Sequence, residues 1–186
     1  MNDRPTDLLD EHRAALAKID AAVAQTSARA GDALTCKRGC DACCVDGLSV
    51  LPVEAALIEV HGGRPPPTQR EGMCAFLDDE GACTVYDARP VLCRTHGLAL
   101  KSADTTDTTR GLRVLSDDVS ACSLNYTARS PQQAEVLDAT KLMMLLVTVD
   151  RRYRARVGLD DDTSRVALTD LARELRGTTN IARRTR

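Results

Sequence analysis

Large apolar side chains are scarce in this sequence. Its 186 residues include no Trp, one Phe and three Tyr, and small Ala and Cys side chains supply much of the 43% hydrophobic fraction. Large side chains contribute most of the free energy gained by burying a core, so packing alone would stabilise this chain weakly. Metal cross-links could supply the missing stability, and we expect the metal-free protein to be loose or unfolded.

Other absences exclude several classes of protein. The net charge is −2, so the basic excess typical of a nucleic-acid binder is missing, and the few aromatics leave no stacking surface for single strands. No stretch approaches the roughly 20 apolar residues that span a bilayer. The N-terminus lacks the basic-then-apolar layout of a secretory signal. We therefore expect a cytoplasmic protein, with no nucleic-acid or membrane partner, whose thiols stay reduced.

Eight cysteines are the main positive feature. Four of them fall within nine residues and the others follow at wide intervals, so that the candidate ligands are Cys36, Cys40, Cys43, Cys44, Cys74, Cys83, Cys93 and Cys122. A tight cluster joined to distant thiols is typical of a chain that wraps a metal. Thiolates are soft ligands that select zinc, copper(I) or iron–sulfur clusters.

Two kinds of metal centre stay open at this point. Zinc takes four ligands, so eight thiols could form two closed zinc sites, but zinc sites usually use pairs of Cys-x2-Cys motifs, and only Cys40 and Cys43 form one. Iron–sulfur sites more often combine a tight cysteine loop with a remote cysteine. The spacing therefore favours an iron–sulfur cluster, most simply [4Fe–4S], with zinc as the alternative. The spacing of Cys36, Cys40 and Cys43 also equals that of radical S-adenosylmethionine enzymes, but no alternating strand–helix pattern accompanies it.

The cysteine pattern resembles that of a known family. The run Cys36-x3-Cys40-x2-Cys43-Cys44 is similar to the motif that names the YkgJ-like, or CxxCxxCC, family of zinc- or iron-chelating proteins. Three later blocks agree with the family over about residues 36–126, namely Cys74-Ala-Phe76-Leu77, then Gly81-Ala-Cys83 through Tyr86 and Arg89-Pro90 to Cys93-Arg94, and finally Cys122-Ser-Leu-Asn125. The first two cysteines are separated by three residues where the family has two, so Cys36 is the least secure ligand.

The resemblance implies a metal-chelating or iron–sulfur protein. A flagellin lysine N-methylase carries a related cysteine domain, in which a cluster accompanies methyl transfer, but no flagellin-specific feature is visible here. We expect an iron–sulfur protein with a redox or redox-sensing role and an unknown redox or protein partner. It could be an oxidoreductase-like enzyme. The alternative is a zinc-binding structural or partner-binding module without catalysis.

Helical patterns flank the cysteines and predict a mainly α protein, with helices around an irregular, loop-rich metal centre. We expect one domain over 1–186, with an N-terminal helix in 1–31, a metal-binding region at 36–126 and C-terminal helices in 130–177. Shorter expectations are a helix over 53–60, an exposed loop over 101–111 and helices over 131–156 and 164–176. The apolar stretch 142–147 should be buried or form a homodimer interface.

Two arginines and a histidine lie near Cys93. Arg89 and Arg94 would either offset thiolate charge and donate to cluster sulfurs, or form a turn and a surface salt bridge. His96 could be an extra ligand, but it ranks below every cysteine. The sequence shows no acid–base pair beyond the thiols.

Overall fold

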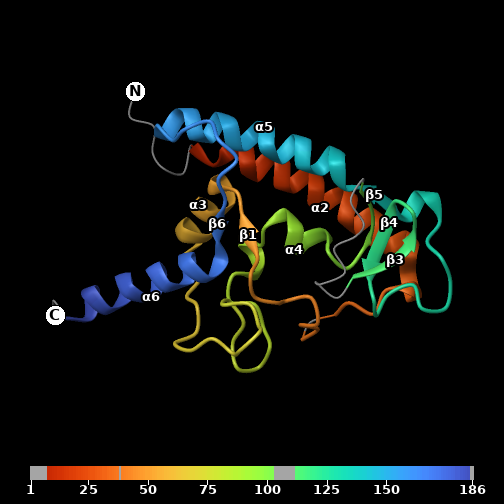
Figure 1. Ribbon diagram of the computed structural model, residues 1–186, viewed down its shortest axis with the longest axis horizontal. Coiled ribbons are helices and arrows are strands. Elements are labelled where there is room, and N and C mark those ends of the chain that lie inside the picture. Colours follow the sequence, from red (N-terminus) through yellow and green to blue (C-terminus); the bar gives the residue numbers. More distant parts are fainter. Residues whose placement is uncertain (1–7, 38, 103–111, 185–186) are drawn as a thin grey trace.

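The computed structural model describes residues 8–37, 39–102 and 112–184, the last seven by their backbone alone (Figure 1). The helices are α2 (Asp10–Ala30), α3 (Pro52–His61), α4 (Val91–Thr95), α5 (Ala139–Val157) and α6 (Leu168–Arg184), with 3-10 turns at Gly31–Ala33, Tyr86–Ala88 and Gln133–Glu135. The strands are β1 (Ser49–Val50), β2 (Ala99–Lys101), β3 (Leu112–Ser116), β4 (Val119–Cys122), β5 (Val136–Asp138) and β6 (Val166–Ala167). The loop expected over 101–111 lies outside the described residues from position 103 onward.

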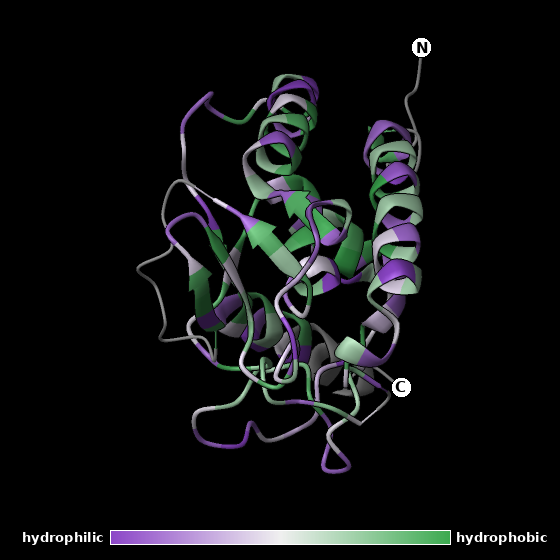
Figure 2. Ribbon diagram, turned by 90° about the vertical axis from the view of Figure 1, so that its right-hand side faces the viewer, coloured by the Kyte–Doolittle hydropathy of each residue, from purple (hydrophilic) through white to green (hydrophobic). Residues whose placement is uncertain are grey.

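Helix α2 forms where its apolar stripe predicts a helix. His12, Ala15, Leu16 and Ile19 are buried at the three- and four-residue spacing that places side chains on one helix face. The helix ends at Gly31, whose φ of 54° is unfavourable for other residues. Helix α5 lies alongside α2 (Figure 1). Hydrophobic and hydrophilic residues alternate along the helices, as amphipathic packing requires (Figure 2).

One buried carboxylate joins the beginnings of α3 and α4. Pro52 suits the first position of α3 because that position needs no N–H donor. Glu54 accepts a hydrogen bond from the Leu51 N–H (3.0 Å) and another from the Val91 N–H (2.8 Å) at the start of α4. Burial raises the pKa of Glu54, and the two backbone donors oppose that rise. Helix α4, which carries Cys93, is thereby fixed against α3.

The expectation of a mainly α protein is wrong, because the described residues also form two β-sheets. One sheet has the order β3–β4–β2–β5, and the other pairs β1 with β6. Strands β2 and β5 are parallel, whereas β4 is antiparallel to both of its neighbours. Each strand is only two to five residues long, too short for a clear alternating pattern. The pairing also joins distant segments, as Ala99 with Val136 shows.

Helix α5 begins later than the sequence predicts. Ser130 and Pro131 have the residue types of a helix start, but the segment after them forms a 3-10 turn and then β5. The helix begins at Ala139, where the Asp138 carboxylate accepts a hydrogen bond from the Lys141 N–H (3.0 Å). Pairing of β5 with β2 therefore overrides the local helix signal.

The main hydrophobic core contains residues of α2, α3, α5 and α6 together with residues of the cysteine-rich segments. The apolar stretch 142–147 enters this core only in part. Leu146 is buried, but Met143 is 44% and Met144 is 65% exposed. Burial of the whole stretch is therefore a wrong expectation for the single chain, and a homodimer interface stays a prediction. Among the described helices, none has both the length and the apolarity needed to cross a bilayer.

Candidate metal centre

The clustered cysteines lie on two successive turns. The Cys40 N–H donates to the Lys37 carbonyl (3.0 Å), and the Cys44 N–H donates to the Asp41 carbonyl (2.8 Å). Each bond reverses the chain over four residues. The Cys44 carbonyl in turn accepts the Cys74 N–H (2.9 Å), which ties this loop to the second cysteine-bearing segment.

A short antiparallel pairing brings Cys74 and Cys83 together. Leu77 pairs with Cys83, and the Thr84 N–H donates to the Phe76 carbonyl (2.9 Å). Phe76 and Leu77 are buried, and both cysteine side chains pack against the main core. The two thiols therefore rest against the hydrophobic core rather than on an exposed loop.

Four half-buried thiols belong to these segments and to α4, and we call them the inner set: Cys44, Cys74, Cys83 and Cys93. Burial, followed by the charges of Cys74 and Cys83, raises the pKa of Cys93 to about 12. The pKa of Cys44 is also raised, first by its hydrogen bond with Cys43, then by burial and by the charges of Cys43, Cys74 and Cys93. The thiols are thus close enough to repel one another as thiolates. A bound cation would relieve this repulsion.

Backbone N–H groups oppose the cost of ionising three cysteines. Burial raises the pKa of each thiol, and the N–H two positions further along the chain lowers it by hydrogen bonding to the sulfur. The donors are Phe76 for Cys74, Val85 for Cys83 and Leu124 for Cys122. Hydrogen bonds to sulfur stabilise thiolates and influence the reduction potential of iron–sulfur centres.

The other four thiols form a second group, which we call the outer set: Cys36, Cys40, Cys43 and Cys122. Cys36 is exposed, Cys40 and Cys43 are half-buried, and Cys122 is buried at the end of β4. Burial raises the pKa of Cys122, and the charges of Cys36, Cys43 and Cys40 raise it further. The last cysteine of the chain is therefore under the electrostatic influence of three of the clustered ones.

Cys43 and Cys44 connect the two sets. A hydrogen bond between the two side chains lowers the pKa of Cys43 to about 7 and raises that of Cys44. Cys43 is therefore the member of the pair that ionises first.

Asn125 is a site residue to which sequence reasoning assigned no role. Its side chain is fully buried, and its amide nitrogen donates to the Cys36 sulfur (3.1 Å) and to the Gly97 carbonyl. Its amide oxygen accepts hydrogen bonds from the Thr35 N–H (2.8 Å) and the Thr35 hydroxyl (3.0 Å). The Cys-x-x-Asn spacing was the only signal for it, because its partners lie far away in the sequence.

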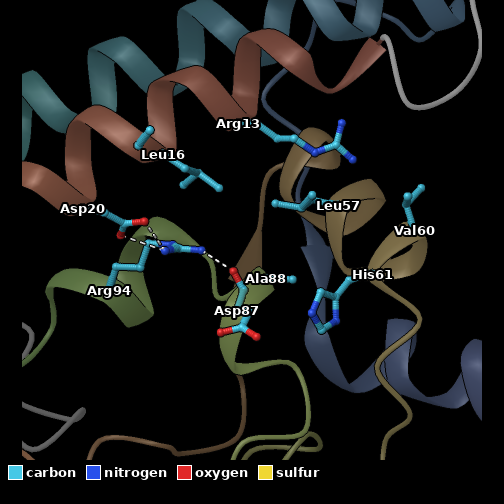
Figure 3. Close-up of a pocket in the computed structure, with 10 residues that line it drawn as sticks. Arg13, Leu16, Asp20, Leu57, Val60, His61, Asp87, Ala88 and Arg94 are labelled. Carbon is cyan, nitrogen blue, oxygen red and sulfur yellow. Dashed lines mark hydrogen bonds and ion pairs between the residues drawn. The ribbon is translucent and has the colours of Figure 1, made fainter.

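The two arginines that flank Cys93 differ in what they contact. The Arg94 guanidinium donates to both carboxylate oxygens of Asp20 (2.7 Å each) and to the carbonyls of Asp87 and Arg89 (2.7 Å each). Figure 3 shows Arg94 directed at Asp20 and Asp87 in a pocket between α2, α3 and the 86–94 segment. Arg94 therefore has a structural role, as the salt-bridge interpretation predicts.

Arg89 acts on the thiols through its charge. Its side chain stacks over the Tyr86 ring at 3.5 Å from the centroid. Burial is the main influence that raises the pKa of Cys83, and the Arg89 charge opposes it. The same charge contributes to the lowered pKa of Cys43, after the hydrogen bond from Cys44. Arg89 Nε also donates to the Tyr86 carbonyl (2.9 Å), the turn contact of the other interpretation, so the structure agrees with both interpretations of Arg89.

The donor chemistry of the site fits a soft metal. All eight cysteines lie within the described residues and are free thiols. In the same part of the chain, no three His, Cys, Asp or Glu side chains converge closely enough to hold a single metal ion. His96 is buried next to α4. Which of these side chains are ligands stays a prediction.

Comparison with known families supports metal binding. Residues 35–112 match the CxxCxxCC family model, whose description is "Putative zinc- or iron-chelating domain", the family that the cysteine pattern resembles. No curated protein and no solved structure matches the chain. The matched segment contains every cysteine except Cys122, and Asn125 also lies beyond it.

Proposed function

We propose, from the match of residues 35–112 to the CxxCxxCC family model, that the inner set holds an iron–sulfur cluster with a redox or redox-sensing role. The observation that supports this proposal is the backbone hydrogen bond from the Cys74 N–H to the Cys44 carbonyl, which joins two cysteine-bearing segments that are distant in sequence. Cys44, Cys74, Cys83 and Cys93 would be the ligands. A bound cluster would supply one-electron chemistry.

Three features support a cluster over a single zinc ion. The inner set joins one cysteine of a tight loop to remote cysteines, which is the iron–sulfur pattern. The N–H groups of Phe76 and Val85 donate to the sulfurs of Cys74 and Cys83. Arg89 places a positive charge near Cys83. Hydrogen bonds and nearby charge are the means by which a protein tunes a reduction potential.

Zinc in a structural role is the second candidate, and one observation favours it. The inner set comes from the 36–47 loop, the 70–85 segment and α4, and the side chains of Cys74 and Cys83 pack against the main core. A closed four-thiolate zinc site would hold such irregular segments together without any reaction. A protein partner would then bind the folded surface.

Visible absorption of anaerobically purified protein, made without a metal-binding tag, separates the two candidates. An iron–sulfur protein should be coloured, should bleach on reduction with dithionite and should recover its colour on reoxidation. Cys74→Ser should remove the colour, whereas Cys36→Ser, outside the inner set, should leave the inner cluster in place. A colourless, folded wild-type protein that contains zinc would overturn the iron–sulfur proposal and support the structural one.

A further inference from the structure

We propose that the pocket between α2, α3 and the 86–94 segment binds a small organic cation, namely a primary ammonium group on a short alkyl body. This inference does not depend on the metal centre, because none of the described residues that line the pocket is a cysteine. The cavity has a volume of about 360 Å³. Ligand pockets occupy roughly 300–1,000 Å³, so this one has room for a small molecule.

The walls of the pocket between the two helices are apolar. Figure 3 shows Leu16 of α2 and Leu57 of α3 directed toward each other, and both belong to the main core. Val60, on the next turn of α3, lies at the rim and is 46% exposed. Its apolar surface is left in water, and covering it with the alkyl part of a ligand would be favourable.

The two arginines of the pocket are already paired with carboxylates. Arg94 donates to both carboxylate oxygens of Asp20 (2.7 Å each) and to two backbone carbonyls. The Arg13 guanidinium pairs with the Asp10 carboxylate (3.1 Å). An anionic ligand would therefore have to compete with a carboxylate of the protein at either arginine.

Two polar side chains of the pocket differ from the arginines in this respect. Within the described part of the chain, the Asp87 carboxylate and the His61 imidazole have neither a hydrogen bond nor an ion pair. Arg94 contacts only the backbone carbonyl of Asp87 (2.7 Å), and Figure 3 shows the Asp87 carboxylate directed away from Arg94. In the same view, His61 and Asp87 lie on one side of the pocket, below Leu57.

An ammonium group matches these two side chains. The carboxylate of Asp87 accepts hydrogen bonds, and an imidazole nitrogen of His61 can accept another, whereas an ammonium group has three N–H donors and no acceptor. Asp87 also supplies the unpaired negative charge of the pocket, and hydrogen bonds between charged groups are the strong ones. With its nitrogen at Asp87 and His61, the ligand would lay its alkyl body against Leu57 and Val60.

Isothermal titration calorimetry of the full-length protein with n-butylammonium chloride tests this proposal. Sodium butyrate is the matched probe, because it has a similar length and the opposite charge. We expect saturable binding of butylammonium at one site per chain and no binding of butyrate. Hydrogen exchange measured by mass spectrometry should place the site, with slower exchange in segments 57–63 and 85–94 when butylammonium is present.

Asp87→Asn should weaken butylammonium binding by about tenfold or more, because it removes the charge that the ligand pairs with. The variant keeps the backbone carbonyl that Arg94 contacts, so the fold should be unchanged, and circular dichroism checks this. Asp79→Asn is the matched control, because Asp79 is an exposed carboxylate outside the pocket. It should bind butylammonium as the wild type does.

A lysine side chain ends in the same alkylammonium group, so Nα-acetyl-lysine methylamide is a third probe. Binding as tight as that of butylammonium would identify a lysine of a protein partner as a ligand of the pocket, and its failure to bind would identify a free amine. Two results would overturn the proposal, namely butylammonium binding that is absent or no tighter than that of butyrate, and equal weakening in Asp87→Asn and Asp79→Asn. Neither result involves the metal content, so the proposed function would stand or fall separately.

Discussion

At the scale of single residues, two buried polar side chains place the cysteine-bearing segments. Glu54 bridges the starts of α3 and α4, and Asn125 joins Thr35 and Cys36 to Gly97. Both side chains replace backbone hydrogen bonds that irregular segments cannot make for themselves. The irregular centre is therefore held in part by specific polar contacts.

Asn125→Asp should destabilise the folded protein by about 1–3 kcal/mol, because the buried nitrogen donor becomes an oxygen that faces the Gly97 carbonyl and the Cys36 sulfur. Urea unfolding measures the change. Ser123→Ala, two residues earlier and exposed, is the control and should have little effect. Equal stability of Asn125→Asp and wild type would show that the amide contacts are dispensable.

Arg89→Gln should lower the reduction potential of an inner-set cluster by tens of millivolts, because reduction adds negative charge and the variant loses a nearby positive one. Arg89→Lys keeps the charge and should retain most of the wild-type potential. Potentiometric titration followed in the visible spectrum makes the comparison. A potential that is the same in all three proteins would remove Arg89 from the account.

At the scale of elements, a buried ion pair joins α5 to α3. The Asp150 carboxylate accepts hydrogen bonds from the Val53 N–H (3.0 Å) and from Arg154 Nε (2.6 Å). Arg154 is 2% exposed and also donates to the Asp162 carboxylate (2.7 Å) and the Ser164 carbonyl (2.6 Å). This network fixes the segment that leads from α5 to β6.

Arg154→Leu should cost about 3–5 kcal/mol of unfolding free energy, because it leaves the Asp150 carboxylate buried without its cationic partner. The matched control is Arg151→Leu on the same helix. Arg151 and its partner Asp161 are 65% and 70% exposed, and such pairs contribute about 0–1 kcal/mol. Urea unfolding of both variants should separate these values, and similar losses would contradict the role given to the network.

Helices could be predicted from the sequence where their apolar stripes are long and their ends are marked. Helix α2 ends at Gly31 as predicted, and α3 runs from Pro52 to His61, with Gly62 as its C-cap. The strands could not be predicted, because they are short and their partners are distant. The start of α5 was misplaced because the local signal at Ser130 competes with the pairing of β5.

At the scale of the whole molecule, a buried histidine links stability to pH. His12 is 1% exposed. Burial, followed by the charge of Arg94, lowers its pKa from 6.5 to about 4. The Asp150 charge opposes this shift, and the Arg13 charge adds to it. Between these values the unfolded chain binds the proton and the folded chain does not. The contribution of His12 to stability is therefore full above about pH 6.5 and is lost as the pH falls towards 4.

We expect His12 to account for about 2–3 kcal/mol of the stability lost between pH 7 and about pH 4.5. His12→Gln should lack this part of the pH dependence, and the difference between the two proteins isolates it from other groups. His61→Gln, at an exposed position, should keep the wild-type dependence. Parallel pH profiles of wild type and His12→Gln in urea unfolding would contradict the prediction.

The candidate site could be predicted in composition but not in arrangement. Thiol chemistry and cysteine spacing identified all eight residues as candidate ligands. The division into inner and outer sets could not be predicted, because it depends on the pairing of Leu77 with Cys83 and on the sheet that returns Cys122 to Cys36. Asn125 and Glu54 form hydrogen bonds with backbone groups of distant segments, and the sequence does not reveal these partners.

The central claim is that this thiol-rich centre holds an iron–sulfur cluster. The most direct measurement is the count of iron, acid-labile sulfide and zinc per chain in protein purified anaerobically without a metal-binding tag. The account predicts iron and sulfide in nearly equal amounts, with iron lost in Cys74→Ser. Stoichiometric zinc without iron or sulfide would contradict it.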